Sequence, residues 1–461
     1  MTQRIKKADF LMFREKRKES AMQFVTTVSI EIAEDLGEFQ EIENKICTVM
    51  REAGGNLLDQ VLHKFEQKIS ADKMLLLKDR RIRKIQSLVG EMHFVRSRVL
   101  DRRLNKTRYP VDDWLQLKSR DPATPALRNK IISSCAERPY RKASHEINTW
   151  TGNDRSTISN WRLTQREAKL KSKKSEVIKN WCMSVLPSVQ SLGADVNPCP
   201  VLAIDLDGTY CKSKGATDHD VKMAVMYTGK KLLNPNGKKK KRFALQNKTL
   251  VTSKTDETLR RFLNRVMQTA ITHYGFNCES FAVVHGDGDA WIKTFQIEYL
   301  EKYASYLDPW HVFKKIRMAT GVKEIPAAWQ ECVYGKPDEL ILHLKNFQLG
   351  LAEKTDSEKI DDLIGYIENN KEGLSPHNVP PEIKELSPGL FKKGSGQMES
   401  NICLGIADRF KQRRMSWSAK GLDNLSSFRT NLLNIQTQPR YNVPNTNHRS
   451  KLWDGLAFKL H

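Results

Sequence analysis

Three acidic residues of this chain stand where carboxylates commonly bind metal ions. Asp207 ends the apolar run 201–207 and Asp287 ends the run 281–287, so both should emerge at the ends of buried strands. Glu399 opens a later helical segment, where an acid is also the ordinary preference of a helix N-terminus. Carboxylate oxygens suit Mg²⁺ or Mn²⁺, and two such ions roughly 3.5–4 Å apart can hold the attacking and leaving oxygens of a phosphodiester. The three acids therefore indicate metal-dependent cleavage of a nucleic acid, if folding brings them together.

Two further side chains near these acids could take part in that chemistry. His311, in the run Asp308-Pro-Trp-His311, could contact a phosphate, with Asp308 as an auxiliary acid, or could simply fix a strand-to-helix turn. Trp291 could stack on an unpaired base, although a tryptophan at the start of an amphipathic helix more often packs in a core.

The run Asp205-Leu-Asp207-Gly-Thr209 also resembles the nucleophile motif of haloacid-dehalogenase-type phosphatases. That resemblance implies that Asp205 attacks phosphorus and that Asp207 acts as acid and base. It leaves the upstream and downstream basic segments without a role, and Trp291 stands where that family has a further acid.

The elements that must position these residues follow from the pattern of apolar residues. Strands are predicted at 201–207, 221–227 and 242–251, then a helix over 259–271, the strand that ends at Asp287, a helix from about 290, a strand at 303–307 and a helix from Trp310. This order predicts a mixed α/β catalytic domain of ribonuclease H type. Helical spacing within 321–395 predicts a helical insertion before Glu399.

The chain before this domain is predicted to be mainly helical and to contain a helix-turn-helix. Helical spacing from Glu38 to Ile69 is broken at Gly54-Gly55, which predicts two helices there, and 82–100 alternates as strands do. Two helices meet at 151–154, and Ile158 and Trp161 are expected to face the core. The exposed side of the second helix would then read DNA through Arg155, Ser156, Thr157, Asn160 and Arg162. A plain helical hairpin is the alternative.

Five segments result from these patterns. The predicted domains are an N-terminal helical region with a small basic β segment (1–110), a helix-turn-helix domain (111–175), the first part of the catalytic core (198–320), the helical insertion (321–395), and the C-terminal part of the core with a basic tail (396–461).

The charge of the chain indicates a polyanionic partner. It has 77 Lys and Arg against 54 Asp and Glu, a formal net charge of +23. Lys239, Lys240 and Lys241 at a hairpin tip, and Lys411 and Arg414 after Glu399, could contact a phosphate backbone or could form solvated surfaces. The eight scattered cysteines include no close pair of the kind that binds zinc, and no apolar run is long enough to cross a membrane. We therefore expect a cytoplasmic protein that does not bind membranes; nucleoid association in a prokaryote is what the family resemblance described next implies.

The same residues resemble those of a known family. Asp207-Gly-Thr-Tyr, Gly286-Asp287-Gly-Asp-Ala-Trp291, Leu307-Asp308-Pro-Trp-His311 and the block from Gly396 through Glu399 to Ser418 are similar to the motifs of mutator-like DDE transposases of bacterial and archaeal insertion sequences. The resemblance implies a ribonuclease H-like core in which Asp207, Asp287 and Glu399 bind two Mg²⁺ or Mn²⁺ ions. The additional acids Asp205 and Asp289 are departures that leave the choice of first and second acid open.

The resemblance also implies an activity and partners. A DDE transposase binds the terminal repeats of its element, cleaves there, and transfers the freed 3′-hydroxyl into target DNA, usually as a homo-oligomer on double-stranded DNA. The alternatives are a catalytically inactive DNA-binding descendant of such an enzyme and the phosphatase that uses Asp205 and Asp207. Neither the repeat sequence, the target preference nor the number of protomers can be inferred from the chain.

Overall fold

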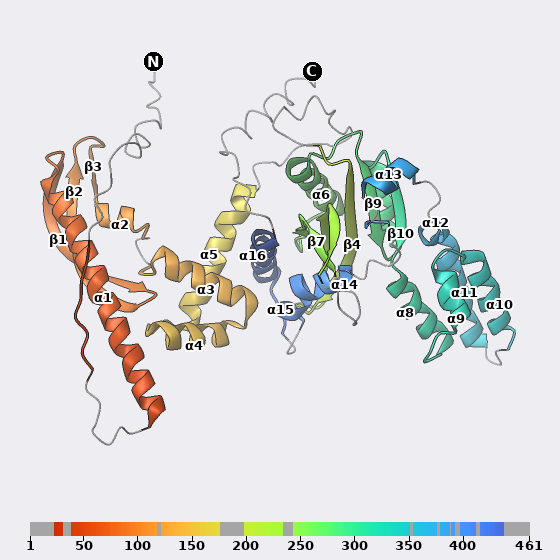
Figure 1. The fold of residues 1–461 in the computed structure, drawn as a ribbon, viewed down its shortest axis with the longest axis horizontal. Helices are drawn as coiled ribbons and strands as arrows, with labels where there is room; N and C mark the ends of the chain where they lie inside the picture. The colour runs from red at the N-terminus through yellow and green to blue at the C-terminus, as the bar shows by residue number, and fades with distance from the viewer. Residues whose placement is uncertain are drawn as a thin grey trace, which may run out of the picture. The chain divides into compact units, whose positions relative to one another are not determined.

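The computed structural model describes residues 23–30, 38–117, 121–175, 198–233, 243–350, 354–375, 379–387, 389–391, 397–411 and 415–437. The chain forms two compact units (Figure 1). The first contains the described parts of 1–132 and 140–160, and the second contains those of 133–139 and 161–461.

The N-terminal unit is built on one long helix and a β ribbon. Its elements are α1 (Phe39–Ala71), β1 (Leu75–Ser87), β2 (Gly90–Asp101), β3 (Lys106–Arg108) and α2 (Pro110–Trp114). The expectation that Gly54-Gly55 separates two helices is wrong, because α1 runs through both residues. A Cβ atom at Gly54 would lie 3.0 Å from a methyl carbon of Val89 in the β1–β2 turn. Gly54 therefore lets the ribbon approach the helix closely rather than ending it.

Three helices follow the ribbon: α3 (Pro125–Glu137), α4 (Tyr140–Thr151) and α5 (Thr157–Ser175). The two predicted helices around 151–154 are thus α4 and α5. Helix α4 buries Ala143 and Ile147, as its spacing predicts.

The second unit contains a five-stranded mixed sheet. Its strands are β4 (Val201–Cys211), β5 (His219–Tyr227), β8 (Thr249–Thr252), β9 (Phe281–Gly286) and β10 (Tyr303–Leu307), in the order β10-β9-β4-β5-β8. Strands β9 and β10 run parallel to β4, whereas β5 is antiparallel to β4 and β8 is antiparallel to β5. The predicted third strand, 242–251, is divided where Asn247 adopts a positive φ of 51°. Its first half, β7 (Phe243–Gln246), pairs with β6 (Gly229–Leu232) instead.

The two faces of this sheet have different partners. Leu202, Ile204 and Leu206 of β4 share an apolar core with helices α6 (Leu259–Tyr274) and α7 (Ala290–Tyr299). Alternate residues of a strand point to opposite faces, so Asp205, Asp207 and Thr209 point the other way. Lys411 contacts Thr209 on that other face.

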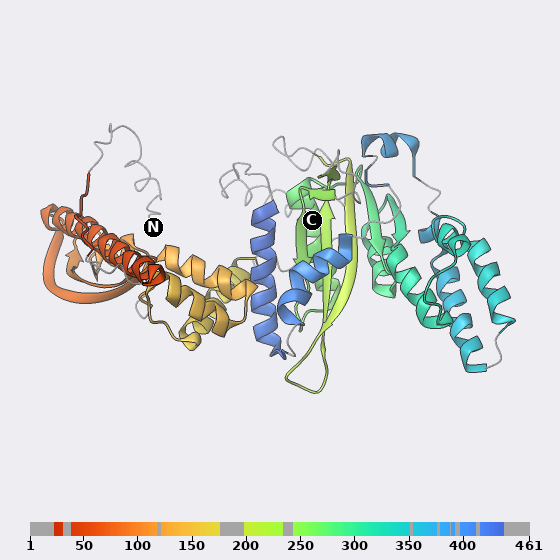
Figure 2. The same cartoon turned by 60° about the horizontal axis from the view of Figure 1, so that its bottom comes forward.

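The face that carries Asp207 is covered by the C-terminal helices. These are α14 (Gln397–Ile402), which packs on β4 and β5, a π-helical turn η3 (Cys403–Ala407), α15 (Asp408–Phe410) and α16 (Ala419–Thr437), which packs on β8. Figure 2 shows α14 and α15 lying along the sheet with α16 beside them. Because Gly405 has no side chain, it accommodates the methyl group of Met223, which pairs with Asp207 across β4 and β5.

The helices α8 to α12 extend from the β10 side of the sheet (Figures 1 and 2). Helix α8 (Pro309–Thr320) shares an apolar core with α9 (Ala327–Val333), α10 (Pro337–Gln348), α11 (Lys354–Asn369) and α12 (Lys371–Leu374), and α13 (Pro381–Leu386) follows. Helix α12 packs on β10. Among the described helices, none combines the length and hydrophobicity that a membrane span requires.

Candidate functional site

The parallel pairing of β4 with β9 brings two of the predicted acids to the same place. The register pairs Asp205 with His285. Asp207 and Asp287 lie two residues further along these neighbouring strands, so both emerge at the same end and on the same face. The predicted convergence of these two acids is what the sheet topology produces.

Asp207 is 6% exposed although it carries a carboxylate. It lies within β4, opposite Met223 of β5, and not at the strand end that the apolar run predicts. Its Oδ1 accepts a hydrogen bond of 2.6 Å from the backbone N–H of Gly208. The second oxygen faces His311 of α8, whose Nε2 lies 3.6 Å from Oδ2.

Asp287 opens the turn between β9 and α7. Its Oδ1 accepts a hydrogen bond of 3.0 Å from the backbone N–H of Asp289. Burial raises the pKa of the Asp287 carboxyl, and the negative charges of Asp289 and Asp207 add to this, against the backbone hydrogen bond and the charge of His311. A buried carboxylate beside like charges is stabilised by a bound cation, so this pair has the donor chemistry of a Mg²⁺ or Mn²⁺ site.

His311 stands in the first turn of α8. Burial lowers its pKa, but the hydrogen bond and negative charge of Asp207, with the charges of Asp287 and Asp308, outweigh burial and leave the pKa raised. Asp308 caps this helix, because its side chain accepts a hydrogen bond of 3.0 Å from the N–H of Trp310. Pro309 at the first helical position completes the start of the helix. Asp308 thus positions His311 and also contributes negative charge.

The helical insertion contacts the turn that carries Asp287. The Tyr366 hydroxyl of α11 donates a hydrogen bond of 2.6 Å to the carbonyl oxygen of Asp287. Gly288 has a φ of +87°, and a Cβ atom there would lie 2.6 Å from the side-chain oxygen of Asn370. Lys293 donates a hydrogen bond of 2.6 Å to the carbonyl of Asn369. The position of the turn that carries Asp287 therefore depends on these helical contacts.

Glu399 lies exposed on α14, on the side of the sheet to which Asp207 points. Among the residues that the structure describes, no group of three or more His, Cys, Asp or Glu side chains is placed to hold one metal ion. The structure thus brings together Asp207, Asp287 and His311, and it leaves Glu399 on a neighbouring helix. Lys411 donates a hydrogen bond of 2.9 Å to Thr209, so its side chain is held beside β4.

Trp291 packs against the sheet core. Its ring centroid lies 6.1 Å from that of Phe262, and Nζ of Lys222 lies 5.7 Å from the same centroid. The structure thus favours the core interpretation of Trp291 over base stacking.

The predicted DNA-reading face of α5 is wrong at two of its residues. Arg155 is 7% exposed and Asn160 is fully buried. Arg155 donates hydrogen bonds of 3.0 Å to Asn160 and 2.5 Å to Gln86, and lies 3.7 Å from Asp121. These two side chains join the start of α5 to the ribbon and are not available to DNA.

The assignment of Ile158 and Trp161 to the core is also wrong, because they are 61% and 46% exposed. The helix instead buries Leu163, Thr164 and Ala168, in addition to Asn160. Ser156 is the N-cap of α5, since its hydroxyl accepts a hydrogen bond of 3.2 Å from the N–H of Ser159. Thr157 is partly exposed, and Arg162 is exposed as predicted. The exposed face is therefore rotated from the one that we predicted.

Some predicted contacts fall outside the described residues, namely Lys239, Lys240, Lys241 and Arg414. Conversely, polar residues at the site were missed. His285 and Tyr227 contact the buried Asp205, and Tyr366 contacts the Asp287 turn. The only signal for His285 was its place two residues before Asp287; Tyr366 had none.

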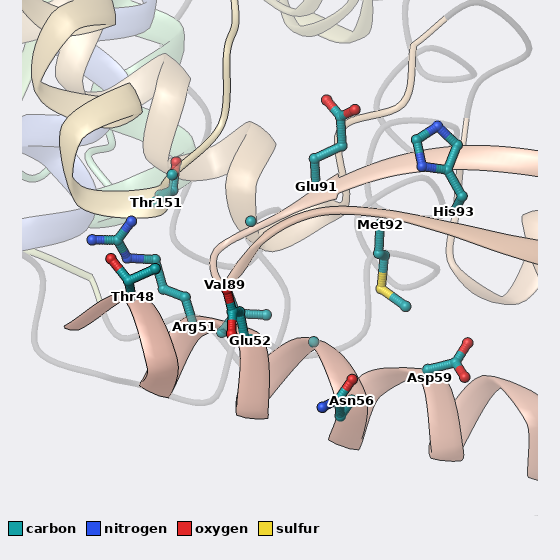
Figure 3. A pocket seen from close by; sticks show the side chains of 13 residues that line it. Thr48, Arg51, Glu52, Asn56, Asp59, Val89, Glu91, Met92, His93 and Thr151 are labelled. Carbon is teal, nitrogen blue, oxygen red and sulfur yellow. The ribbon is translucent and has the colours of Figure 1, made fainter. Parts of the chain in front are cut away.

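A pocket of about 460 Å³ lies in the N-terminal unit between α1, the β1–β2 turn and Thr151-Gly152. In Figure 3, Met92 points toward α1, whereas Glu91 and His93 point away from it. The lining mixes Arg51 with several carboxylates, which favours no single class of ligand. The predicted site residues do not line this pocket.

Comparison with known proteins places the chain in a family. A family model matches residues 32–437, which is most of the chain. The chain belongs to the uncharacterised protein family UPF0236. A UPF0236 protein encoded in the vanSb 3′ region of Streptococcus gallolyticus is 24% identical over 406 residues, covering 84% of this chain and 81% of the relative.

Two UPF0236 proteins of Caldanaerobacter subterraneus subsp. tengcongensis are each 20% identical over 405 residues. The matches cover 86% of this chain and 77% and 73% of the relatives. The name of the first of these two proteins combines four separate designations from that strain, and the name of the second combines two.

Among solved structures, the Drosophila P element transposase strand transfer complex matches 67% of this UPF0236 chain and 79% of the other chain, with 11% identity and a TM-score of 0.20. A score that low supports no conclusion about fold or activity.

Proposed function

We propose that the chain is a DDE transposase of the mutator-like group that cleaves the ends of an insertion sequence and joins them to target DNA. The observation that carries the proposal is the convergence of Asp207 and Asp287 on neighbouring parallel strands, with His311 3.6 Å from Asp207. The motifs that resemble those of DDE transposases contain all three residues.

The order of elements supports a ribonuclease H-like core. Within the five-stranded sheet, the antiparallel strands β4, β5 and β8 are followed along the chain by helix α6, strand β9, helix α7 and strand β10. Strands β9 and β10 run parallel to β4, and β4, the first strand, lies at the centre of the sheet. A helix bearing Glu399 then covers the face to which Asp207 points.

Two family relatives with several designations in one strain also agree with the proposal. Multiple copies of one gene in one genome are what a mobile element leaves behind.

In the proposed mechanism, Asp207 and Asp287 would hold divalent metal ions, and Glu399 would supply a further carboxylate to one of them. When bound, the ions ease deprotonation of the attacking water or 3′-hydroxyl and neutralise charge at the scissile phosphate. His311, whose Nε2 lies 3.6 Å from Asp207, would donate a hydrogen bond to a phosphate oxygen. Tyr366 holds the backbone of Asp287 in place. The protein would act as a homo-oligomer on paired ends of double-stranded DNA.

The burial of Asp205 argues against the phosphatase alternative. A nucleophile must reach its substrate, but Asp205 is 0% exposed and accepts hydrogen bonds from Tyr227 and His285.

The test is metal-dependent cleavage of duplex DNA that spans the sequences on either side of the gene. Asp207→Ala, Asp287→Ala and Glu399→Ala should each lower cleavage in Mg²⁺ or Mn²⁺ by at least about 100-fold while sparing DNA binding, because each removes a ligand that acts in the transition state. Glu298→Ala, which removes an exposed carboxylate of α7, is the matched control. Cleavage that persists in Asp207→Ala would refute the assignment. Binding without cleavage by the unmodified chain would instead identify the inactive DNA-binding alternative.

A further inference from the structure

A buried polar pair lies directly behind the two converging acids. Asp205 of β4 and His285 of β9 are opposite each other in the sheet register, and Nδ1 of His285 lies 2.8 Å from Oδ1 of Asp205. Asp205 is 0% exposed and His285 is 5% exposed. Each stands two residues before a predicted metal ligand: Asp205 precedes Asp207 on β4, and His285 precedes Asp287, which follows the end of β9.

The carboxylate of Asp205 also reaches the next strand. The hydroxyl of Tyr227, on β5, donates to Asp205 at 3.1 Å from Oδ1 and 3.3 Å from Oδ2. The Tyr227 side chain is fully buried. One carboxylate thus joins β9, β4 and β5, the three central strands of the sheet (Figure 1).

Burying these polar side chains makes folding less favourable than burying apolar side chains in the same place would. A buried carboxylate loses its hydration and is tolerated only when hydrogen bonds replace it, whereas apolar residues of similar size pack at no such cost. The neighbouring positions of the same strands, such as Ala203, Val225 and Val283, are buried apolar residues. A polar cluster placed among these apolar residues calls for a role that apolar packing cannot fill.

Directional hydrogen bonds can fill such a role. The pairing of β4 with β9 extends to Asp205 and His285, and Asp207 and Asp287 lie just beyond it. Apolar contacts would tolerate small shifts between the strands, but a hydrogen bond of 2.8 Å constrains both distance and direction.

We propose that Asp205, His285 and Tyr227 are positioning residues that hold β4 and β9 at the separation and register in which Asp207 and Asp287 share a divalent cation. This inference rests on the proposed function, because it assumes that these two acids bind metal.

The conservative variant separates a positioning role from simple stability. In His285→Asn, the side-chain amide nitrogen takes the place of Nδ1 and can still donate to Asp205. In His285→Leu, the apolar packing is kept but the hydrogen bond is lost. Tyr227→Phe removes only the hydroxyl that donates to Asp205.

The experiment is a titration of the full-length, metal-free chain with Mn²⁺, followed by electron paramagnetic resonance, with circular dichroism to confirm that each variant is folded. Asp287→Asn identifies the signal of the site by removing it. His285→Leu should weaken Mn²⁺ binding by at least about tenfold, the range found when residues that orient metal ligands are changed. His285→Asn should stay within about threefold of the unmodified chain, and Tyr227→Phe should fall between the two.

A folded His285→Leu protein with unchanged Mn²⁺ affinity would overturn the inference. If that variant fails to fold, unchanged affinity in Tyr227→Phe overturns it in the same way. Absence of an Asp287-dependent Mn²⁺ signal in the unmodified chain also overturns it. If Mn²⁺ binding follows the expected order but element-end DNA is not cleaved, the transposase proposal fails while the positioning role stands.

Discussion

Asp287 illustrates how a partly buried carboxylate beside other acids destabilises the protein that carries it. Its pKa is raised by burial and by neighbouring negative charges, so the metal-free folded chain binds a proton there more tightly than the unfolded chain does. Folding stability from this group therefore falls as pH rises from the ordinary carboxyl pKa through the raised one. The full penalty is present above the raised pKa, and a divalent cation would remove it.

We therefore predict that Asp287→Asn stabilises the metal-free protein at pH 7 and removes its stabilisation by Mg²⁺. For the unmodified chain, Mg²⁺ at one hundred times its Kd should add about 2.7 kcal/mol to the free energy of unfolding, measured by urea denaturation. Glu298→Ala should respond to Mg²⁺ as the unmodified chain does. An Asp287→Asn variant that is less stable without metal and equally stabilised by Mg²⁺ would contradict the metal-site assignment.

His311 should make the free energy of unfolding fall with rising pH, as Asp287 does, but from a different cause. Its pKa is raised because the charge of Asp207 outweighs burial, so its contribution to stability is complete below the ordinary histidine pKa and is lost as pH rises through the raised value. In metal-free protein, His311→Gln should flatten the decline in the free energy of unfolding above pH 6.5, measured by urea denaturation at several pH values. An equally steep decline in the variant would show that other groups cause it.

At the scale of elements, two arginines at the start of α5 have opposite expected behaviour: Arg155 lies two residues before the helix and Arg162 lies within it. Arg155→Ala should destabilise the protein by about 3 kcal/mol, because it removes the buried hydrogen bonds to Gln86 and Asn160 and the buried cation that lies 3.7 Å from Asp121. Arg162→Ala, at an exposed position, should change stability by less than about 0.5 kcal/mol and should weaken DNA binding instead. Thermal unfolding and a gel-shift assay measure the two effects. Equal loss of stability in both variants would show that Arg162 is also structural.

The elements were more predictable than the directions of their side chains. Apolar runs located β4 and β9 because buried strands are apolar on both faces, and the spacing in 259–271 located α6. The face of α5 was not predictable, because Arg155 and Asn160 find buried hydrogen-bond partners that are distant in sequence, which leaves Ile158 exposed. Arg409 is a similar case, since it is 1% exposed and donates to the carbonyl of Cys135. Composition alone does not distinguish an arginine that binds phosphate from one that binds a carbonyl group.

In the candidate site as well, some residues could be predicted from the sequence and others could not. Asp207 and Asp287 were predictable because each follows an apolar run, and parallel pairing then brings them together. Tyr366 was not, because it reaches the Asp287 turn from a helix that the sequence assigns to an insertion, and nothing local marks that contact. The exposed position of Glu399 on α14 follows from how that helix packs, which its spacing does not determine.

At the scale of the whole molecule, the net charge of +23 predicts how DNA binding depends on salt. Each phosphate that a Lys or Arg neutralises releases a condensed counterion, so the logarithm of the binding constant falls by about 0.9 per contact for each unit of log salt. A chain that uses six or more contacts should lose about 1,000-fold in affinity for random duplex DNA between 50 and 200 mM NaCl. Fluorescence anisotropy in EDTA would measure this without competition from divalent ions. Asp207→Ala should keep the same slope, because it removes no cation, whereas Arg162→Ala should lower the slope by about one contact if α5 lies on DNA. A DNA affinity that does not change with salt would mean that the excess of positive charge does not bind nucleic acid. That result would contradict the proposed activity on DNA.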